Sequence, residues 1–362
     1  MQTRSQFRLL VVRLGAMGDI LHALPAVTAL RQAHPTWIID WVVEPCWQAL
    51  LTTNASNQQT GPGSGQPLVD HLHFAATKEW RKSIFSRNTF REINELRKNL
   101  RAGAYDVVLD LQGAIRSAIV GQLAGCRRMI GEAEPREHAA RWFFTEFVAT
   151  RGAHVIEQDI ELASAIAGDE LTPCQPWLPA DPAAELWAES ILPLNSSQTS
   201  VLINPGAGWG AKRWPVERYA AVARQLAERG ARVLVNAGPG EEPLAEAIVQ
   251  QAGGAATALF CSLAQLIALT RRVSLVIAGD TGPLHLACAL GRPVVGIYGP
   301  TDPSRNGPFG APFKVLRSPL SQRDHTRRPE PEAGLLTIEP QDVLCAADEL
   351  LYPETATSEN SL

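Results

Sequence analysis

The chain has 362 residues, more than one hydrophobic core usually contains, and its 45% hydrophobic and 19% charged side chains are typical of a folded globular protein. Its 33 Lys and Arg against 37 Asp and Glu give a net charge of −4, which argues against general nucleic-acid binding. The six cysteines are scattered without a Cys-x-x-Cys pair, so we predict neither a zinc site nor a disulfide framework, and we expect a reducing cytoplasm.

Short apolar runs alternate with helical patterns along both halves of the chain. The runs typical of strands occupy residues 8–14, 38–43, 107–111, 201–204, 233–237, 275–278 and 294–298. Helical patterns follow several of them, for example at 18–33 and 115–123. This alternation indicates parallel sheets with crossover helices, so we expect an α/β protein of two doubly wound, Rossmann-like domains that face a central cleft.

A proline-rich stretch at 173–200 separates the two halves and is interpreted as a linker with one short helix around 183–190. The predicted parts are a first domain at 1–178, a linker at 179–199 and a second domain at 200–339. A final helical pattern at 340–351 can pack back across either domain, including the first. The polar stretch 52–66 is expected to be a flexible surface loop, and the tail at 353–362 is expected to be disordered.

The apolar stretch 9–30 is neither a signal peptide nor a membrane span, because Arg13, Asp19 and His22 interrupt it. Its residues fit instead the first predicted strand, the turn after it and the start of the next helix. The chain is therefore not predicted to cross a membrane.

An aspartate stands where the first predicted strand turns into its helix. The sequence Gly15-Ala16-Met17-Gly18-Asp19 leads out of the strand, so we place Asp19 at a helix N-terminus that faces the cleft. A carboxylate there is expected to be ionised and can accept a proton from an attacking hydroxyl group, which makes Asp19 a candidate general base. The alternative is that Asp19 only caps the helix. His22 is either its partner or a packing residue.

The second half opens with a strand and a glycine-rich loop, Gly206-Ala207-Gly208-Trp209-Gly210, followed by Lys212 and Arg213. Glycines let a ligand approach the backbone, and the two cations supply charge for a diphosphate. Two solvated surface cations are the alternative interpretation. In a later loop, Glu242 is placed where it can hydrogen-bond a ribose diol, or it is an ordinary acid in the first turn of a helix.

The run 275–278 leads into Gly279-Asp280-Thr281-Gly282-Pro283-Leu284-His285. We expect Thr281 to cap a helix, Pro283 to lie in its first turn, and the free N–H groups with the helix dipole to bind an anion. His285 lies one turn beyond Thr281 on roughly the same face. Alternatively, Asp280 and Thr281 only cap the helix and His285 only packs. The glycine-rich loop at 206–210 and the loop that begins at Gly279 both follow predicted strands. We therefore expect them to meet at the edge of the sheet where open α/β sheets bind ligands.

A basic segment lies at residues 78–101, where eight cations against three acids give a local charge of +5. This charge favours an acidic partner, such as sugar acids or lipid phosphates at a membrane surface. Trp80, Ile84 and Phe85 are candidates for contact with acyl or sugar faces. The alternative is a solvated amphipathic helix with an apolar underside.

Three motifs together carry a family resemblance: Met17-Gly18-Asp19-Ile20-Leu21-His22, the stretch Gly279-Asp280-Thr281-Gly282-Pro283-Leu284-His285, and Tyr298-Gly299-Pro300-Thr301-Asp302-Pro303. They resemble the ADP-heptose:lipopolysaccharide heptosyltransferases, a glycosyltransferase family of GT-B fold, over nearly the whole chain. The resemblance to heptosyltransferase I in particular rests on Trp41-Val42-Val43-Glu44, Glu79-Trp80-Arg81-Lys82, Asp110-Leu111-Gln112-Gly113 and Arg136-Glu137.

The resemblance implies an inverting, metal-independent and cofactor-free transfer of heptose from ADP-L-glycero-D-manno-heptose to Kdo of the lipopolysaccharide inner core, with Kdo-lipid A as acceptor. In that family Asp19 would be the general base. The donor site would comprise Lys212, Asp280, Thr281, Gly282 and His285, together with the Glu242 suggested above. The acceptor would contact Arg81, Lys82, Arg136 and Gln112. The enzyme would be cytoplasmic and peripheral on the inner membrane of a Gram-negative-type bacterium.

The residues favour the same chemistry without the resemblance. Displacement of ADP from an anomeric carbon passes through an oxocarbenium-like state, which needs a base on one side and charge neutralisation on the other. Asp19 and Lys212 are suited to these two tasks. The chain has no Asp-x-Asp motif of the kind that bridges a nucleotide sugar through a metal, so cations and helix termini are expected to neutralise the diphosphate.

Two features depart from the family pattern. Gly15 and Ala16 stand where heptosyltransferase I commonly has hydroxyl residues, and the stretch 52–66 is atypical. The alternatives are a heptosyltransferase II-like or other member with a different acceptor, a nucleotide-sugar epimerase or hydrolase, and a non-catalytic lipopolysaccharide- or nucleotide-binding module. A dinucleotide oxidoreductase is disfavoured, because no Gly-x-Gly-x-x-Gly turn follows the first strand.

Overall fold

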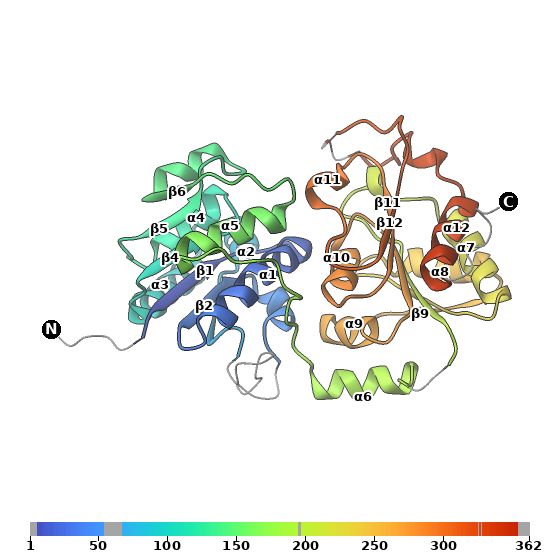
Figure 1. Cartoon of the computed structure of the whole chain (residues 1–362), viewed down its shortest axis with the longest axis horizontal. Coiled ribbons are helices and arrows are strands. Elements are labelled where there is room, and N and C mark those ends of the chain that lie inside the picture. Colours follow the sequence, from blue (N-terminus) through green and yellow to red (C-terminus); the bar gives the residue numbers. More distant parts are fainter. Residues whose placement is uncertain (1–5, 54–66, 195–196, 325, 327, 354–362) are drawn as a thin grey trace. The chain divides into compact units, whose positions relative to one another are not determined.

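The computed structural model in Figure 1 describes residues 6–53, 67–194, 197–324, 326 and 328–353. The chain divides into two compact units, Met1–Pro179 and Ala180–Leu362. Most of the predicted loop at 52–66 and all of the predicted tail beyond Pro353 lie outside the described residues.

The first unit contains a six-stranded sheet in which every neighbouring pair of strands is parallel, in the order β3-β2-β1-β4-β5-β6. Its strands are β1 (Arg8–Val12), β2 (Ile38–Val43), β3 (His71–Phe74), β4 (Val107–Asp110), β5 (Met129–Glu132) and β6 (Glu146–Val148). Its helices are α1 (Met17–Ala33), η1 (Pro45–Leu50), α2 (Thr77–Lys82), α3 (Arg87–Gly103), α4 (Ile115–Gln122), η2 (His138–Phe143) and α5 (Val155–Ala167).

The second unit repeats this plan with the order β12-β11-β10-β7-β8-β9, again all parallel. Its strands are β7 (Ser200–Asn204), β8 (Arg232–Asn236), β9 (Ala256–Leu259), β10 (Leu275–Gly279), β11 (Val294–Tyr298) and β12 (Phe313–Arg317). Its helices are α6 (Pro182–Ile191), η3 (Gly210–Lys212), α7 (Val216–Glu228), α8 (Glu242–Gln251), α9 (Leu263–Thr270), α10 (Gly282–Ala289), α11 (Pro303–Asn306), η4 (Leu335–Thr337) and α12 (Pro340–Leu351).

The central strands of both sheets have continuous apolar stretches, as expected where helices cover both faces of a sheet. Residues 9–12 of β1 and 275–278 of β10 are fully buried. A parallel sheet covered in this way needs continuous rather than alternating hydrophobic runs. The alternation of strands and helices therefore confirms the predicted doubly wound α/β units.

Both sheets reverse their strand order at one point. In the first unit the order changes direction between β1 and β4, and in the second between β7 and β10. The loops after these strands diverge to opposite faces of the sheet and leave room for a ligand at the carboxyl edge. The loops that carry Asp19, Gln112, Lys212 and Asp280 follow these four strands.

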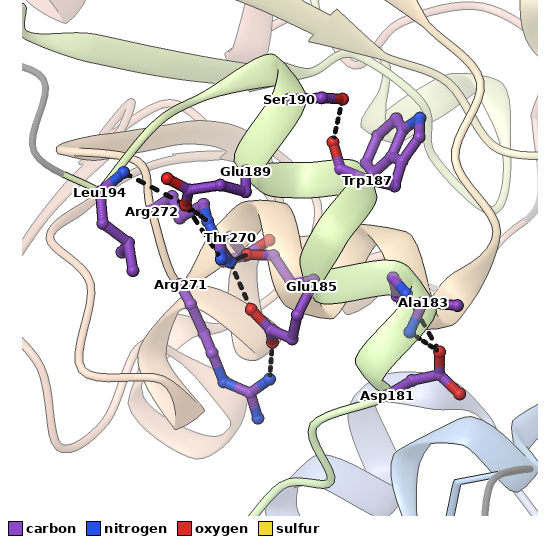
Figure 2. Close-up of polar contacts among 12 residues, drawn as sticks. Asp181, Ala183, Glu185, Trp187, Glu189, Ser190, Leu194, Thr270, Arg271 and Arg272 are labelled. Atoms are coloured by element: carbon purple, nitrogen blue, oxygen red, sulfur yellow. Dashed lines mark hydrogen bonds and ion pairs between the residues drawn. The ribbon is translucent and has the colours of Figure 1, made fainter.

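The short helix expected around 183–190 is present as α6, and it packs on α9 within the second unit. Ala184 and Ala188 form a small core with Ala268, and small side chains let the two helices approach closely. Figure 2 shows the charged flank of this contact, where Glu185 binds Arg271 at 2.6 Å and also pairs with Arg272. The helix is thus a fixed part of the second unit.

The last helix, α12, also belongs to the second unit. Val343, Leu344, Ala346 and Ala347 are part of its core, and α12 packs on α7 and on the strands β10 to β12. Of the two packing positions that the sequence left open for this helix, its apolar face therefore takes the one in the second domain.

None of the helices within the described ranges is both long enough and apolar enough to span a bilayer.

The α6 contact makes a direct prediction about packing. Ala188 is fully buried, so Ala188→Leu should force the helices apart and lower the free energy of unfolding by about 1–3 kcal/mol. Leu186 on the same helix is 74% exposed, and Leu186→Ala should change it by no more than about 0.5 kcal/mol. Urea unfolding followed by circular dichroism measures both. Equal effects of the two variants would contradict the packing described.

Candidate active-site residues

Asp19 lies in the first turn of α1, directly after the loop that leaves β1. Its Oδ2 accepts a hydrogen bond from the Ala16 amide at 3.0 Å, which satisfies one of the free N–H groups at the helix start. Its Oδ1 lies 3.5 Å from Nη2 of Arg13. The Asp19 side chain is 33% exposed while Arg13 is only 7% exposed. Asp19 therefore acts as a helix cap and still presents a carboxylate to solvent.

Gly15 in the same loop has no room for a side chain. Its φ is +151°, and a Cβ there would lie 2.6 Å from Nε1 of Trp47. Both the backbone conformation and the indole of Trp47 therefore favour glycine. This packing gives a physical reason for the departure from the family's hydroxyl residue at this position.

The loop after β4 is tied to the loop after β1. Asp110 is buried, and its Oδ1 accepts hydrogen bonds from the amides of Gln112 at 2.7 Å and Gly113 at 2.9 Å. The Oε1 of Gln112 in turn accepts from the Leu14 amide at 2.8 Å. These bonds fix the two loops at the point where the strand order reverses. The side-chain carbonyl of Gln112 is thus engaged within the protein, and its contact with an acceptor stays a prediction.

Three buried ionisable side chains of the first unit influence one another electrostatically: Arg13, Asp110 and, on α5, Asp159. Burial raises the pKa of Asp110 to about 6, although the amides of Gly113 and Gln112 oppose the rise. Burial likewise raises the pKa of Asp159 to about 7; Arg13 opposes this rise and the negative charge of Asp19 adds to it. Residue patterns gave no role to Arg13 or Asp159, although Arg13 stands out as a charge inside an apolar run, and Asp110 appeared only within a motif that carries the family resemblance.

The proposed acceptor residues lie on two parts of the first unit. Arg81 and Lys82 are exposed on α2, where Lys82 pairs with Glu79 at 2.8 Å in an exposed ion pair that contributes little to stability. Arg136 is also exposed, and its backbone packs against Gly113. Arg136 and Gln112 are therefore brought together, whereas Arg81 and Lys82 stand on a separate helix.

Apolar side chains beside these cations differ in their exposure. Trp80 is partly buried against the core, and its Nε1 donates a hydrogen bond to Glu92 at 2.8 Å, so the expectation that it contacts acyl or sugar faces is not supported. Ile84 is 59% and Phe85 90% exposed. These two side chains are the ones that present an apolar surface next to the basic segment.

Lys212 forms the centre of the site in the second unit. It follows the glycine-rich loop after β7, and its ammonium group pairs with the carboxylate of Asp280 at the end of β10. Its Nζ also donates to the Asp280 backbone carbonyl at 3.2 Å and lies 4.4 Å from the centre of the Trp209 ring. Both charged side chains are about nine-tenths buried. The ion pair therefore joins the segments after β7 and β10, the two strands between which the strand order reverses.

Asp280 also contacts His285, whose Nε2 lies 3.4 Å from its Oδ1. Burial alone would raise the pKa of Asp280, but the hydrogen bond with His285 and the charge of Lys212 outweigh it and hold the pKa well below its ordinary value. Asp280 is thus a permanent anion that orients one cation and one imidazole ring.

Thr281 occupies the N-cap position of α10 but does not cap it through its side chain. Its hydroxyl instead donates to the Gly279 carbonyl at 3.2 Å. The expected capping bond is therefore wrong, because the strand end competes for the hydroxyl. Pro283 lies in the first turn as predicted. In the part of the chain that the structure describes, the Thr281 side chain therefore caps none of the amides that begin α10.

The glycine-rich loop is covered by a later segment of the chain. The Ala211 amide donates to the Arg328 carbonyl at 3.0 Å, and the Glu332 amide donates to the Ala211 carbonyl at 3.2 Å. A Cβ on Gly210 would lie 1.6 Å from the Pro329 carbonyl oxygen. Glycine is therefore required here for close backbone approach, and the loop is held rigidly beside Lys212.

An acid from the loop after β8, Glu241, contacts the glycine-rich loop. Oε1 of Glu241 accepts from the Ala207 amide at 3.1 Å and lies 3.6 Å from Nη2 of Arg213. Glu242 is the first residue of α8. The ribose contact of Glu242 remains a prediction, while Glu241 is a residue that the sequence pattern did not single out from its neighbour.

Across the described ranges, no group of three or more His, Cys, Asp or Glu side chains is arranged to hold a metal ion.

The raised pKa of Asp159 predicts a pH-dependent stability. Because the folded pKa lies near 7 and the ordinary value is 3.8, the stability contributed by protonated Asp159 is complete below about pH 4 and is lost as the pH rises through 7. Asp159→Asn should therefore gain up to about 4 kcal/mol relative to wild type between pH 4 and pH 8, at about 1.4 kcal/mol per pKa unit.

The matched control for this prediction is Thr270→Val. Thr270 is as buried as Asp159 but carries no charge, and its hydroxyl donates a hydrogen bond to the Leu266 carbonyl at 2.7 Å. Its effect on the free energy of unfolding should be the same at pH 5 and pH 8. A pH-independent difference between Asp159→Asn and wild type would contradict the assignment.

Comparison with known proteins gives consistent results. The family model described as glycosyltransferase family 9 (heptosyltransferase) matches residues 93–335. Lipopolysaccharide heptosyltransferase 1 of Escherichia coli K12 is 30% identical over 316 residues, covering 86% of this chain and 94% of that protein. Lipopolysaccharide heptosyltransferase 1 of Pseudomonas aeruginosa is 26% identical over 362 residues, with 93% of each chain covered.

Solved structures show the same likeness. The E. coli heptosyltransferase WaaC with ADP superposes with a TM-score of 0.77 at 28% identity, covering 95% of this chain and all of that one. The same enzyme with ADP-2-deoxy-2-fluoro heptose gives 0.73. A family 9 glycosyltransferase from Veillonella parvula gives 0.80 at 22% identity, which concerns the fold alone. These likenesses confirm the predicted GT-B-type fold.

Proposed function

The chain belongs to glycosyltransferase family 9, the heptosyltransferases, and on this premise we propose that it transfers a heptose from ADP-heptose to Kdo of the lipopolysaccharide inner core. The donor is suggested by the relative WaaC, whose structures hold ADP and a fluorinated ADP-heptose analogue. The acceptor is suggested by relatives named lipopolysaccharide heptosyltransferase 1. The residues of each unit support one half of this reaction.

The observation that carries the proposal is the pairing of Lys212 with Asp280 at the reversal point of the second sheet. A lysine ammonium has three N–H donors, and Asp280 takes two of them through its carboxylate and its carbonyl. The third remains for an oxygen of a bound diphosphate. Since Asp280 fixes Lys212 before a ligand arrives, the ammonium charge is preorganised where charge develops on the leaving ADP.

Other parts of the second unit add to this neutralisation. The first amides of α10, at Thr281 and Gly282, can donate to a phosphate oxygen, and the helix dipole favours negative charge there. His285 is held by Asp280 on the same helix and is proposed to contact the donor. We infer that these groups together stabilise the leaving diphosphate without a divalent metal. Asp280 acts as a positioning residue and not as a phosphate ligand.

Asp19 supplies the base for the other half of the reaction. Its cap bond with Ala16 and its contact with Arg13 leave lone pairs on both carboxylate oxygens for an acceptor hydroxyl. In the transfer, this hydroxyl oxygen forms a bond to the anomeric carbon while the bond from that carbon to the β-phosphate oxygen breaks. The hydroxyl proton passes to Asp19, and ADP leaves with the electron pair. Attack opposite the leaving group inverts the anomeric centre.

The acceptor is proposed to lie against the basic surface of the first unit. Arg81, Lys82 and Arg136 are exposed cations suited to the carboxylate of Kdo and to lipid A phosphates. Exposed Ile84 and Phe85 are suited to the edge of a lipid surface, and a peripheral position on the cytoplasmic face of the inner membrane follows from such an acceptor. The amide group of Gln112 would bind a sugar hydroxyl.

The proposed function is tested by incubating the protein with ADP-heptose and Kdo-terminated lipid A in the presence of EDTA. Mass spectrometry should show the acceptor gaining one heptose. Transfer of heptose only to an acceptor that already carries a heptose would indicate the acceptor specificity of a heptosyltransferase II. Release of free heptose without acceptor would indicate a hydrolase and would contradict the proposal.

Asp19→Asn should lower kcat by roughly 10²-fold, because the acceptor hydroxyl loses its proton acceptor, while the affinity for ADP changes little. The control is Asp181→Asn. Asp181 caps α6 by accepting from the Ala183 and Ala184 amides, so it shares only the capping role of Asp19. Heptose-transfer kinetics that fall equally in both variants would show that Asp19 is only a cap.

Lys212→Ala should weaken ADP binding by about tenfold or more, because the diphosphate loses a cation and then faces the buried charge of Asp280. Lys314→Ala is the control, since Lys314 is half-exposed on β12 and pairs only with Glu349 among the described residues. Calorimetric titration with ADP measures both affinities. Unchanged affinity in Lys212→Ala would refute the donor site.

A further inference from the structure

Glu44 ends the motif Trp41-Val42-Val43-Glu44, and the proposed reaction gives it no role. It follows β2 at the carboxyl edge of the first sheet, and it is only 4% exposed. A carboxylate that is removed from water needs hydrogen-bond donors around it. The donors that surround Glu44 therefore show which part of the protein this buried group holds in place.

The carboxylate of Glu44 binds the start of α2. Its Oε1 accepts hydrogen bonds from the Thr77 hydroxyl at 2.5 Å and from the Lys78 amide at 3.2 Å. The residue before α2 is Ala76, whose side chain cannot cap the helix. Glu44 therefore supplies, from the end of another strand, a capping bond that the sequence next to α2 does not provide.

The α2 helix needs contacts of this kind because it is short. It has six residues, all of them within the described ranges, and none of these six is buried. Isolated helices of this length are not stable in water. Trp80 packs partly against the core and donates a hydrogen bond to Glu92. The middle of α2 is thus held by Trp80, and its first turn is held by Glu44.

Glu44 is also bound to the loop between β1 and α1. Its amide donates to the Leu14 carbonyl at 3.0 Å, and Leu14 opens that loop. Trp47 in η1 fills the space beside Gly15 of the same loop, and its ring centre lies 5.7 Å from the Lys78 ammonium nitrogen. The backbone of Glu44 therefore holds the loop before α1, while its side chain holds α2.

We propose that Glu44 is a positioning residue for the acceptor, which sets where the cations of α2 stand relative to Asp19. The inference rests on the proposed function, in which Arg81 and Lys82 on α2 bind the acceptor and Asp19 takes its proton. Glu44 is buried and does not touch the acceptor. Cations on a loosely held helix spend only part of the time in the arrangement that binds, and the apparent affinity falls by that fraction.

The test measures the kinetics of heptose transfer by Glu44→Ala with ADP-heptose and Kdo-lipid A. The substitution removes both bonds to α2 and keeps the backbone bond to Leu14, so the loop that carries the base is retained. KM for Kdo-lipid A should rise by about threefold or more, while kcat and the affinity for ADP in calorimetric titration stay within about twofold of wild type. An unchanged KM for the acceptor would overturn the inference.

A merely structural role would give a different pattern. Loss of folded enzyme lowers kcat and leaves both KM values unchanged, because the remaining molecules bind normally, and this pattern would overturn the inference. The matched control is Asp106→Ala. The Asp106 carboxylate also binds an amide, that of Arg8 at 2.8 Å, but at the amino edge of the same sheet. Its KM for the acceptor should equal that of wild type, and an equal rise in both variants would contradict the inference.

Two further variants test the bonds themselves. Glu44→Gln keeps a side-chain carbonyl that can accept from Thr77 and Lys78, so KM for the acceptor should stay within about twofold of wild type. A rise as large as that in Glu44→Ala would overturn the inference. Thr77→Val removes one donor, and adding it to Glu44→Ala should raise KM no further, because the bond is already lost. Additive effects of the two substitutions would contradict the inference.

Hydrogen exchange gives a readout that does not depend on heptose transfer. The amides of α2 should exchange faster in Glu44→Ala than in wild type, since the first turn loses its capping bond. Equal exchange in the two proteins would overturn the inference.

The outcomes also distinguish this inference from the proposed function. Absence of heptose transfer by wild type would refute the proposed function and, with it, the role of Glu44 toward the acceptor. Transfer by wild type with an unchanged acceptor KM in Glu44→Ala would refute the inference alone.

Discussion

The buried ion pair between Lys212 and Asp280 is the interaction on which the proposed chemistry depends most. It joins the loops after β7 and β10 where the strand order of the second sheet reverses. Removing two charges from water is unfavourable unless each finds several partners, and here His285, the Asp280 carbonyl and the Trp209 ring supply them. The result is an ammonium group fixed in place before any ligand binds.

The first unit places a negative charge, instead of a positive one, at the reversal point of its sheet. Its reversal point between β1 and β4 presents an anion, Asp19, supported by the buried guanidinium of Arg13. The parallel sheets are the common cause, because their carboxyl edges expose loop ends and helix N-termini whose backbone amides favour negative charge. In the first unit the Ala16 amide binds the protein's own carboxylate, and in the second we propose that the amides at the start of α10 bind a phosphate.

Local patterns predicted the central strands, Asp19 and the Lys212 loop, because continuous apolar runs and glycine-rich turns depend on neighbours in sequence. The predicted runs did not include β3, β5, β6, β9 or β12. Four of these strands have only three or four residues, which carry too little hydrophobic signal. The burial of Asp159 was not predicted, because it depends on the packing of α5 and not on its neighbours in sequence. The predicted capping bond of Thr281 is absent, because its hydroxyl donates instead to the backbone carbonyl of Gly279 at the end of β10.

The central claim is that Lys212 and the start of α10 hold the donor diphosphate, and a crystal structure of the protein with ADP tests it most directly. The account predicts a β-phosphate oxygen within hydrogen-bond distance of Lys212 Nζ and of the Thr281 or Gly282 amide, with the Lys212–Asp280 pair intact. A diphosphate bound elsewhere on the chain, or a Lys212 ammonium turned away from the phosphates, would contradict it.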